Sequence, residues 1–368
     1  MKKTLLSLLA ALALVAAACS GGAQPTTTEA GEQTTTTTST TAPPPETTTT
    51  EAAPEIGTPD NPIKVLFVPS VSAEEIIAGG EILKETLAEA TGLTFEVSVP
   101  TSYAATINEM CASPQDTMGF IPAQAYVLAN ELCGVEVALK AKRFGYTEYW
   151  TEFITQRDSD IQSLEDIAGR KWAYPDAGST SGFLVPSGIF KQLGVEPGES
   201  FEAGGHTATV RAVYNEEADF GTVFFSPAVD PEGNVLWDGT LETADVPADK
   251  VDKCKVTEDG KNIDCDGWIP KDARRNLREE APDVIQKVRI FALSDPIPND
   301  TLSFGPEFPE DLRSQIVEAI VAFAENDPEG FATAFDAYSW SGVAPASDPE
   351  FDFIRGLVQE LGISVEDL

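Results

Sequence analysis

The chain has 368 residues, of which 60 are Asp or Glu and 24 are Lys or Arg, so its formal net charge is −36 at pH 7. A charge of this sign and size argues strongly against nucleic acid and an anionic membrane surface as partners, because both would repel it. It does not exclude a small anion, because N–H and O–H donors act within a few ångströms while distant carboxylates are screened over a Debye length of about 8 Å.

The N-terminus has the pattern of an export signal over residues 1–18. Two lysines precede an apolar stretch from Leu5 to Ala18, which is too short and wrongly flanked for a stable membrane span. The run from Ala16 to Cys19 resembles a bacterial lipobox, in which the cysteine is lipidated and becomes the first residue of the mature protein. We therefore expect Cys19 to carry a lipid anchor. The alternative is a plain cleaved signal, in which Cys19 has no role.

Residues 19–60 are expected to form a tether. Threonine, proline and glutamate dominate residues 24–60, with runs such as Thr34 to Thr38. A segment with almost no large apolar side chains cannot offset the entropy lost on ordering. This segment is therefore predicted to be extended and disordered, holding a folded domain away from a membrane.

The remaining chain, from about Ile56 to Leu368, is longer than one hydrophobic core usually serves. Two lobes are the natural expectation. We predict that residues 61–148 and 291–368 form lobe 1 and that residues 149–290 form lobe 2.

Short apolar runs alternate with segments of helical periodicity. Ile63 to Val68 is typical of a buried strand, Glu74 to Thr91 has helical spacing, and Phe95 to Val99 is the next strand. The same alternation continues through residues 106–111, 117–121, 123–132, 150–155, 164–168, 171–174, 181–193, 208–214 and 219–225. This pattern predicts an α/β fold with mainly parallel sheets in each lobe.

Two stretches are expected to cross between the lobes and form a hinge. Tyr149 to Thr155 alternates apolar and polar residues and is the candidate for the first crossing, with Val288 to Leu293 as the return. Later segments look like amphipathic helices that go back to the first lobe: residues 310–323, 329–337 and 349–362. The acidic insert 235–269 has weak periodicity, which indicates a surface loop or hairpin.

Four cysteines remain once Cys19 is set aside. An even number in an exported chain favours two disulfides. The local spacings suggest Cys111 with Cys133 and Cys254 with Cys265. The chain has one histidine and no CxxC pair, so neither a metal site nor a cofactor is expected.

The most informative motif is Asp-Ala-Gly-Ser-Thr-Ser-Gly at residues 176–182. A strand that turns through glycine and three adjacent hydroxyls into a helix gathers backbone N–H and side-chain O–H donors at one point, which suits a tetrahedral oxyanion. His206, the only histidine, follows two glycines and can supply another donor. The alternative is an ordinary Ser/Thr helix cap on a glycine-rich turn.

An ordered series of motifs covers nearly all of the folded region. The stretches are Ser102 to Glu109, Gly119 to Ala129, Tyr149, Arg157 to Gly169, Gly178 to Pro186, Gly205-His206 with Ala218 to Gly221, and Ile297 to Asp300. Taken together, this set resembles the periplasmic phosphonate-binding proteins, the phosphate, phosphite and phosphonate receptors of ABC importers. The resemblance implies a two-lobed periplasmic-binding-protein fold of type 2 with a hinge of two crossings.

The resemblance also implies a set of ligand-binding residues. Ser179, Thr180 and Ser181 would grip the oxyanion at the helix N-terminus, with phenolic O–H groups from Tyr103 and Tyr149 and a ring N–H from His206. Neutral donors suffice, because hydrogen bonds to a charged group are roughly twice as strong as neutral ones. The alternative role of each tyrosine is packing in the core. The alternative role of His206 is to cap a turn, and that of Asp219, at the start of a strand, is structural.

Asp300 marks a departure from the family pattern. In the family, an acidic residue at this position and a glutamate after the strand at residues 222–225 are associated with the amino end of aminoalkyl phosphonates. The second position here is Phe225-Ser226-Pro227, with no carboxylate. The expected ligand is therefore phosphate, phosphite or a small alkyl phosphonate. Asp300 would accept a hydrogen bond from a protonated ligand oxygen and so select against sulfate.

The leading hypothesis is a monomeric, lipid-tethered receptor outside the cytoplasmic membrane that presents its ligand to ABC permease subunits and performs no chemistry on it. One alternative is an exported serine-type hydrolase that uses a hydroxyl of residues 179–181 with His206 as base. The Gly-x-Ser-x-Gly pattern is not met, because Thr180 occupies its centre. A second alternative is a ligand-free surface or adhesion lipoprotein, for which a Thr/Pro tether is also typical.

Overall fold

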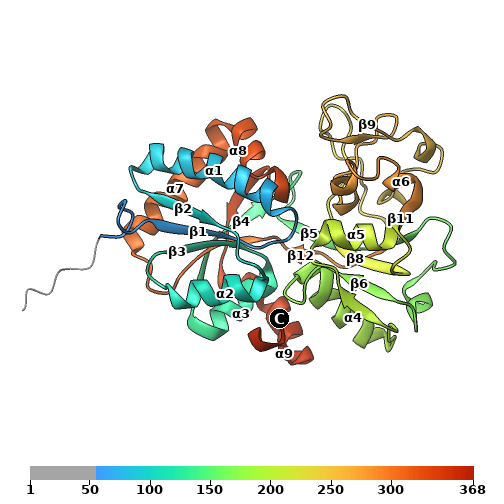
Figure 1. The fold of residues 1–368 in the computed structure, drawn as a ribbon, viewed down its shortest axis with the longest axis horizontal. Coiled ribbons are helices and arrows are strands. Elements are labelled where there is room, and N and C mark those ends of the chain that lie inside the picture. Colours follow the sequence, from blue (N-terminus) through green and yellow to red (C-terminus); the bar gives the residue numbers. More distant parts are fainter. Residues whose placement is uncertain (1–54) are drawn as a thin grey trace, which may run out of the picture. The chain divides into compact units, whose positions relative to one another are not determined.

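The computed structural model describes residues 55–368, which are built on two six-stranded sheets (Figure 1). The export signal, Cys19 and nearly all of the tether lie outside the described residues. Within residues 55–368 no helix combines the length and the apolar character that crossing a membrane requires.

The first sheet is built from both ends of the described chain. Its strands, in spatial order, are β14 (Gly342–Pro345), β4 (Glu136–Lys142), β13 (Thr301–Phe304), β3 (Thr117–Ile121), β1 (Ile63–Phe67) and β2 (Phe95–Ser98). Helices cover both faces, with one group above and one below the sheet in Figure 1: α1 (Ala73–Thr91), α7 (Glu310–Asn326) and α8 (Pro328–Ala334) on one side, α2 (Tyr103–Ala112) and α3 (Ala123–Cys133) on the other.

The second sheet is built from the middle of the chain. Its strands are β11 (Val288–Leu293), β5 (Glu148–Gln156), β8 (Phe220–Phe225), β6 (Trp172–Tyr174) and β7 (Ser200–Glu202), and β12 (Ile297–Pro298) pairs with the start of β5. The helices that accompany this sheet are α4 (Val185–Leu193), α5 (His206–Tyr214) and α6 (Val284–Lys287). The first sheet with its helices is called the first half of the molecule, and the second sheet with its helices is called the second half. The last helix, α9 (Asp352–Leu361), contacts both α3 of the first half and α4 of the second.

The local sequence explains the opening βαβ unit. β1 is buried along most of its length, and it pairs in parallel with both β2 and β3. α1 buries Ile76, Leu83 and Leu87 on one face, as its helical spacing predicts. It ends at Gly92, whose φ of 74° is left-handed and favours glycine. These elements match the expected segments to within a residue or two.

The sheets are mixed, which corrects the expectation of mainly parallel strands. β13 runs antiparallel to β3 and β4, and β5 runs antiparallel to β8 and β11. The physical reason is the path of the chain: strands that leave one half or return to it enter the sheet from the opposite end. The sequence expectation did not include β4, β13 and β14.

The crossings lie beside the stretches expected to contain them. β5 and β11 are strands of the second sheet, so the chain passes between sheets at residues 143–147 and 299–300, where β4 gives way to β5 and β12 to β13. The lobe boundary expected at residue 291 falls inside β11. Both crossings run beside one another, because Ile297 pairs with Tyr149.

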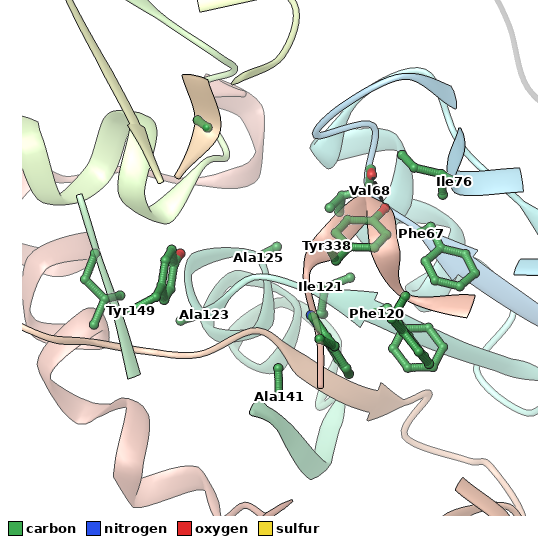
Figure 2. Packing of buried hydrophobic residues seen from close by; sticks show 14 of the residues in the cluster. Phe67, Val68, Ile76, Phe120, Ile121, Ala123, Ala125, Ala141, Tyr149 and Tyr338 are labelled. Atoms are coloured by element: carbon green, nitrogen blue, oxygen red, sulfur yellow. Dashed lines mark hydrogen bonds between the residues drawn. The ribbon is translucent and has the colours of Figure 1, made fainter. Parts of the chain in front are cut away.

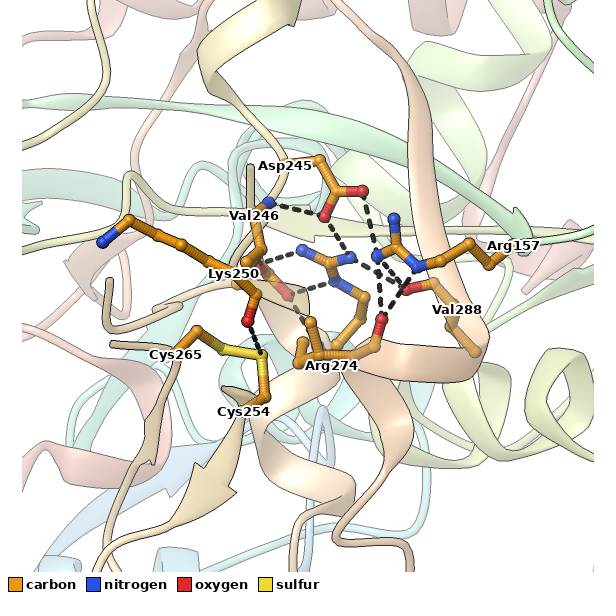
Figure 3. A network of polar contacts seen from close by, with 10 residues as sticks. Arg157, Asp245, Val246, Lys250, Cys254, Cys265, Arg274 and Val288 are labelled. Carbon is orange, nitrogen blue, oxygen red and sulfur yellow. Dashed lines mark hydrogen bonds and ion pairs between the residues drawn. A yellow bond between two sulfur atoms is a disulfide. The ribbon is translucent and has the colours of Figure 1, made fainter. Parts of the chain in front are cut away.

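The insert 235–269 contains the expected hairpin, formed by β9 (Lys255–Val256) and β10 (Ile263–Asp264). It is more than a surface loop, because Val246, Val251 and Ile263 are buried. Figure 3 shows the polar contacts beneath it, in which Asp245 pairs with Arg274 at 2.7 Å and with Arg157 at 3.1 Å. This network joins the insert to Arg157, the residue after β5, and to the short helix η5 (Ala273–Leu277).

Both expected disulfides are present, Cys111–Cys133 and Cys254–Cys265. The first joins the C-terminal parts of α2 and α3, and the second closes the hairpin of the insert. The core of the first half includes a group of aromatic rings: Phe67 stacks with Phe120 and with Tyr338, at centroid distances of 4.8 and 5.8 Å (Figure 2). Tyr338 therefore belongs to the core and, as described below, to the site.

Candidate functional site

A small cavity lies between the two sheets, beyond the carboxyl ends of β1, β3 and β4, where open α/β sheets bind ligands. Its volume is about 30 Å³, which exceeds the roughly 10–15 Å³ that one water molecule needs but leaves no room for a bulky substituent. The residues that line it come from both halves of the molecule and from the crossings between them: Val68, Ser70, Tyr103, Pro122, Arg143, Tyr149, Ser179, Ser181, His206, Phe224, Asp300, Ala337 and Tyr338.

Ser179 and Ser181 stand where β6 turns into a helix. The helix starts with a π-helical turn at Thr180–Leu184, continues as α4, and is capped by Ser179, whose Oγ accepts from the backbone N–H of Gly182 at 3.1 Å. Both serines are buried and line the cavity. Because the first N–H groups of a helix lack intrahelical partners and carry the positive end of its dipole, this corner attracts an anion.

The two tyrosines face the same cavity from other elements. Tyr103 is the first residue of α2, Tyr149 lies near the start of β5, and both are at most 3 % exposed. Burial raises the pKa of each phenol above its ordinary value. Both therefore keep their proton at neutral pH and remain available as O–H donors. A side chain at Gly178 would come within 2.5 Å of Tyr103 Cβ, so glycine is needed for this approach of the two halves.

His206 begins α5 after Gly205, whose φ of 132° favours glycine. Its backbone N–H donates to Ser70 O at 2.9 Å across the cavity, and its Nε2 lies 3.5 Å from Ser179 Oγ. Its Nδ1 is buried and has no hydrogen-bond partner among the described residues. Burial, and then the charge of Arg143, lower the pKa of His206 to about 3. The ring is therefore neutral at neutral pH and can donate one hydrogen bond.

The low pKa of His206 predicts an acid-sensitive fold. Between the unfolded pKa of about 6.5 and the folded pKa of about 3, the unfolded chain binds more protons than the folded one, so stability falls as the pH falls. Relative to His206→Asn, wild type should lose about 1.4 kcal/mol of unfolding free energy per pH unit below about 6.5. Urea unfolding from pH 7.5 to 4.5 measures this. The difference between wild type and His206→Asn must be measured because Asp176, whose pKa burial raises to about 6, changes the unfolding free energy with pH in the opposite direction. The prediction would be contradicted if the unfolding free energies of the two proteins changed in parallel with pH.

Arg143 is a cavity residue that the sequence reasoning missed. Its side chain is buried and forms an ion pair with Asp300, donates to Asn299 Oδ1, and donates from Nε to Tyr338 O at 2.8 Å. Its guanidinium carbon lies 5.0 Å from the ring centre of Tyr149. The site therefore contains a cation balanced by a carboxylate, where sequence reasoning expected neutral donors with Asp300 alone.

Thr180 is the one expected hydroxyl that does not line the cavity. Its Oγ1 accepts from the backbone N–H of Gln124 at 2.8 Å, and the side-chain amide of Gln124 donates to Ala177 O at 3.0 Å. Because Gln124 lies in α3 of the first half, these bonds join the two halves. Ser70 and Tyr338 also line the cavity unpredicted. Ser70 lies three residues after the end of β1, a position that could have indicated it, whereas nothing local marks Tyr338.

The model of the family described as "ABC transporter, phosphonate, periplasmic substrate-binding protein" matches residues 65–351. The chain belongs to this family. Membership of the phosphonate-binding family agrees with the two-lobed, type 2 fold. It also makes the chain a solute-binding component of a transporter, which confirms the resemblance seen in the motifs.

Three known proteins that resemble this chain are 14–28 % identical to it. The phosphate-import protein PhnD of Mycolicibacterium smegmatis is 28 % identical over 322 residues, covering 82 % of this chain and 86 % of that protein. Among solved structures, PhnD1 from Prochlorococcus marinus in complex with methylphosphonate has a TM-score of 0.60 at 14 % identity, covering 82 % of this chain and 98 % of that one. A binding protein component of an ABC phosphonate transporter from Pseudomonas aeruginosa also has a TM-score of 0.60, at 18 % identity, over 80 % of this chain and 84 % of that one.

Proposed function

We propose that this protein binds a small phosphorus oxyanion in the cavity between its lobes and delivers it to the permease of an ABC importer. The observation that carries the proposal is the convergence of buried donors from both halves on one cavity of about 30 Å³. Buried polar groups cost free energy unless they are hydrogen-bonded. An oxyanion with several acceptor oxygens satisfies such groups together.

The proposed binding residues are Ser179, Ser181, Tyr103, Tyr149 and His206. They supply hydroxyl, phenol and imidazole donors, and the helix N-terminus adds backbone N–H groups. Thr180 is proposed to contribute through its backbone, because its side chain does not line the cavity.

Arg143 adds charge to this set. Its pairing with Asp300 leaves the pair neutral as a unit, so the anion meets a cation without a large excess of positive charge. We propose that this balance binds a dianion while keeping its dissociation fast enough for delivery.

Phosphate, phosphite or a small alkyl phosphonate fits the site better than an aminoalkyl phosphonate. Arg143 already occupies the carboxylate of Asp300, so the ammonium group of such a ligand would have to compete with a buried guanidinium. The size of the cavity favours the same ligands. The M. smegmatis relative is a phosphate-import protein and the P. marinus structure holds methylphosphonate, which supports this range.

Sulfate should be rejected on hydrogen-bonding grounds. Asp300 keeps a carboxylate beside the donors in the cavity. At neutral pH hydrogen phosphate, and the monoanions of phosphite and of a small alkyl phosphonate, carry an O–H that can donate to such an acceptor, whereas sulfate is fully deprotonated and is repelled by it.

The proposed setting follows from the N-terminal sequence. Cleavage before Cys19 and lipidation of this residue would attach a monomeric receptor to the outer face of the membrane through the tether of residues 19–60. Lobe 1 would be formed by the chain before residue 143 and after residue 300, with lobe 2 between them. A Cys19→Ser chain should be released from the membrane fraction, and continued membrane association would contradict the anchor.

Catalysis is not part of the proposal. Ser179 lies near His206, but Nδ1 of His206 has no carboxylate or other partner among the described residues. A serine nucleophile activated by histidine needs that second partner to orient the ring. The pair is therefore better suited to binding than to hydrolysis.

The test is a melting-temperature screen of residues 56–368 against phosphate, phosphite, methylphosphonate, aminoethylphosphonate and sulfate. A ligand at 100 times its dissociation constant adds about 2.7 kcal/mol of stability, which raises the melting temperature by several degrees. We expect a response to at least one of the first three and none to sulfate. A flat profile with all five would overturn the proposed function.

A further inference from the structure

Two neighbouring arginines of η5 make contacts in different halves of the molecule. Arg274 is fully buried in the second half, where it bonds to Asp272 at 2.9 Å and to Asp245 at 2.7 Å (Figure 3). Arg275 instead bonds to the first half: its Nη2 donates to Ser339 Oγ at 2.9 Å and to Asp336 O at 3.2 Å. η5 is thus fixed in one lobe by one arginine and tied to the other lobe by the next.

The contact of Arg275 is not an ordinary surface ion pair. Arg275 is only 6 % exposed, whereas the carboxylate of Asp336, 3.7 Å away, is largely in solvent. The bonds to a hydroxyl and a backbone carbonyl therefore hold the guanidinium in place. A hydrogen bond from a charged donor in such a buried position is stronger than one between neutral groups.

The acceptor segment leads directly to the ligand cavity. Ser339 has a φ of 59°, in the left-handed region, and follows Tyr338. Tyr338 lines the cavity, donates from its hydroxyl to Val68 O at 2.7 Å, and accepts from Nε of Arg143 at its carbonyl. The same tight turn is therefore held by Arg143 on the cavity side and by Arg275 from the opposite lobe.

We propose that Arg275 is a latch that holds the two lobes closed and positions the Tyr338 wall of the cavity, so that it sets how long a ligand stays bound without touching it. Opening the cavity requires the lobes to separate, and separation breaks the bonds from Arg275 to Ser339 and Asp336. Hinge closure of this kind is a common transition in two-lobed binding proteins. The ligand readout of this inference rests on the proposed function, whereas lobe separation does not.

The latch predicts a change in dissociation rate. Arg275→Met keeps the apolar stem and removes the donors, and Ser339→Gly removes the hydroxyl at a position whose φ favours glycine. With inorganic phosphate or methylphosphonate, whichever raises the melting temperature of wild type, each variant should dissociate about tenfold faster, as expected for the loss of one charge-assisted hydrogen bond. The association rate should change little, because the ligand contacts remain.

A control variant and a double variant test whether the faster dissociation comes from the loss of the Arg275–Ser339 bond. Arg211→Met is the matched control, because Arg211 forms an exposed pair with Glu280 in the same lobe, and it should leave the dissociation rate unchanged. In the double variant Arg275→Met/Ser339→Gly the two effects should add only in part, because both substitutions remove the same Arg275–Ser339 bond. Equal rates for Arg275→Met and Arg211→Met would overturn the latch, as would full additivity in the double variant.

A second readout needs no ligand. Spin labels on cysteines placed at Ile82 and Leu241, which are exposed in the first and second halves, report the separation of the lobes. Arg275→Met should shift the distance distribution to longer values, and Arg211→Met should not. Unchanged distances would overturn the latch. If wild type binds none of the ligands, the proposed function fails and the distances alone decide the latch. Ser339→Gly decides it if Arg275→Met does not fold.

Discussion

Replacing Ser179 and Ser181 together by alanine is expected to abolish the ligand-induced rise in melting temperature. Both hydroxyls line the cavity at the helix N-terminus, and each hydrogen bond to a charged ligand contributes about 1.5–3 kcal/mol. Losing two should raise the dissociation constant about 10²- to 10⁴-fold. Titration calorimetry with the ligand that gives the largest thermal response measures the change directly.

The free protein should lose little by comparison. Ser179 caps the helix by accepting from Gly182 N–H, and removing such a cap costs about 1 kcal/mol. Ser187→Ala, in α4 of the same helix but outside the cavity, is the control and should leave binding intact. An unchanged dissociation constant in the Ser179/Ser181 variant would mean that the anion is not held at this helix.

The second large effect is expected at Arg143 and Asp300. The side chains are 7 % and 14 % exposed, and removing one partner of a buried ion pair costs about 3–5 kcal/mol because the other charge stays buried and unpaired. Arg143→Met and Asp300→Asn should each lower the unfolding free energy by this amount. The double variant should lose less than the sum, because neither charge remains. Urea unfolding at pH 7 tests both statements.

The exposed pair Arg170–Asp160 is the matched comparison. Its side chains are 36 % and 76 % exposed, so Asp160→Asn should cost less than about 1 kcal/mol. If Asp300→Asn were as mild as Asp160→Asn, the cavity pair would be well solvated and the proposed charge balance would be wrong.

Arg143→Met should also gain a thermal response to aminoethylphosphonate, because Asp300 is then free to accept its ammonium group.

Local sequence determines much of this fold, and the prediction succeeded where the signal is local. The periodicity of α1, the apolar run of β1 and the turn into α4 were all placed within a few residues. The disulfides were predicted correctly because each joins cysteines that are close in the sequence. The direction of β13 was not predictable in this way, since it depends on where the chain re-enters the first sheet.

Among the residues that line the cavity, some belong to local motifs and others are placed there only by the path of the chain. Ser179, Ser181 and His206 belong to motifs with turn glycines, and all of them line the cavity. Arg143 and Tyr338 belong to no local motif, and they reach the cavity only because the crossings bring distant segments together. Thr180 belongs to the same motif as the two serines, but its hydroxyl contacts Gln124 of the first lobe and does not line the cavity.

The two disulfides lie within single lobes, and this has a mechanical consequence. Cys111–Cys133 ties together α2 and α3, whose opposite ends carry Tyr103 and Gln124 at the cleft, and Cys254–Cys265 stiffens the insert. No disulfide among residues 55–368 joins one lobe to the other. The disulfides can therefore make each lobe rigid without linking one lobe to the other. In the proposed transport cycle, opening and closing then depend on non-covalent bonds between the lobes, which are weak enough to break.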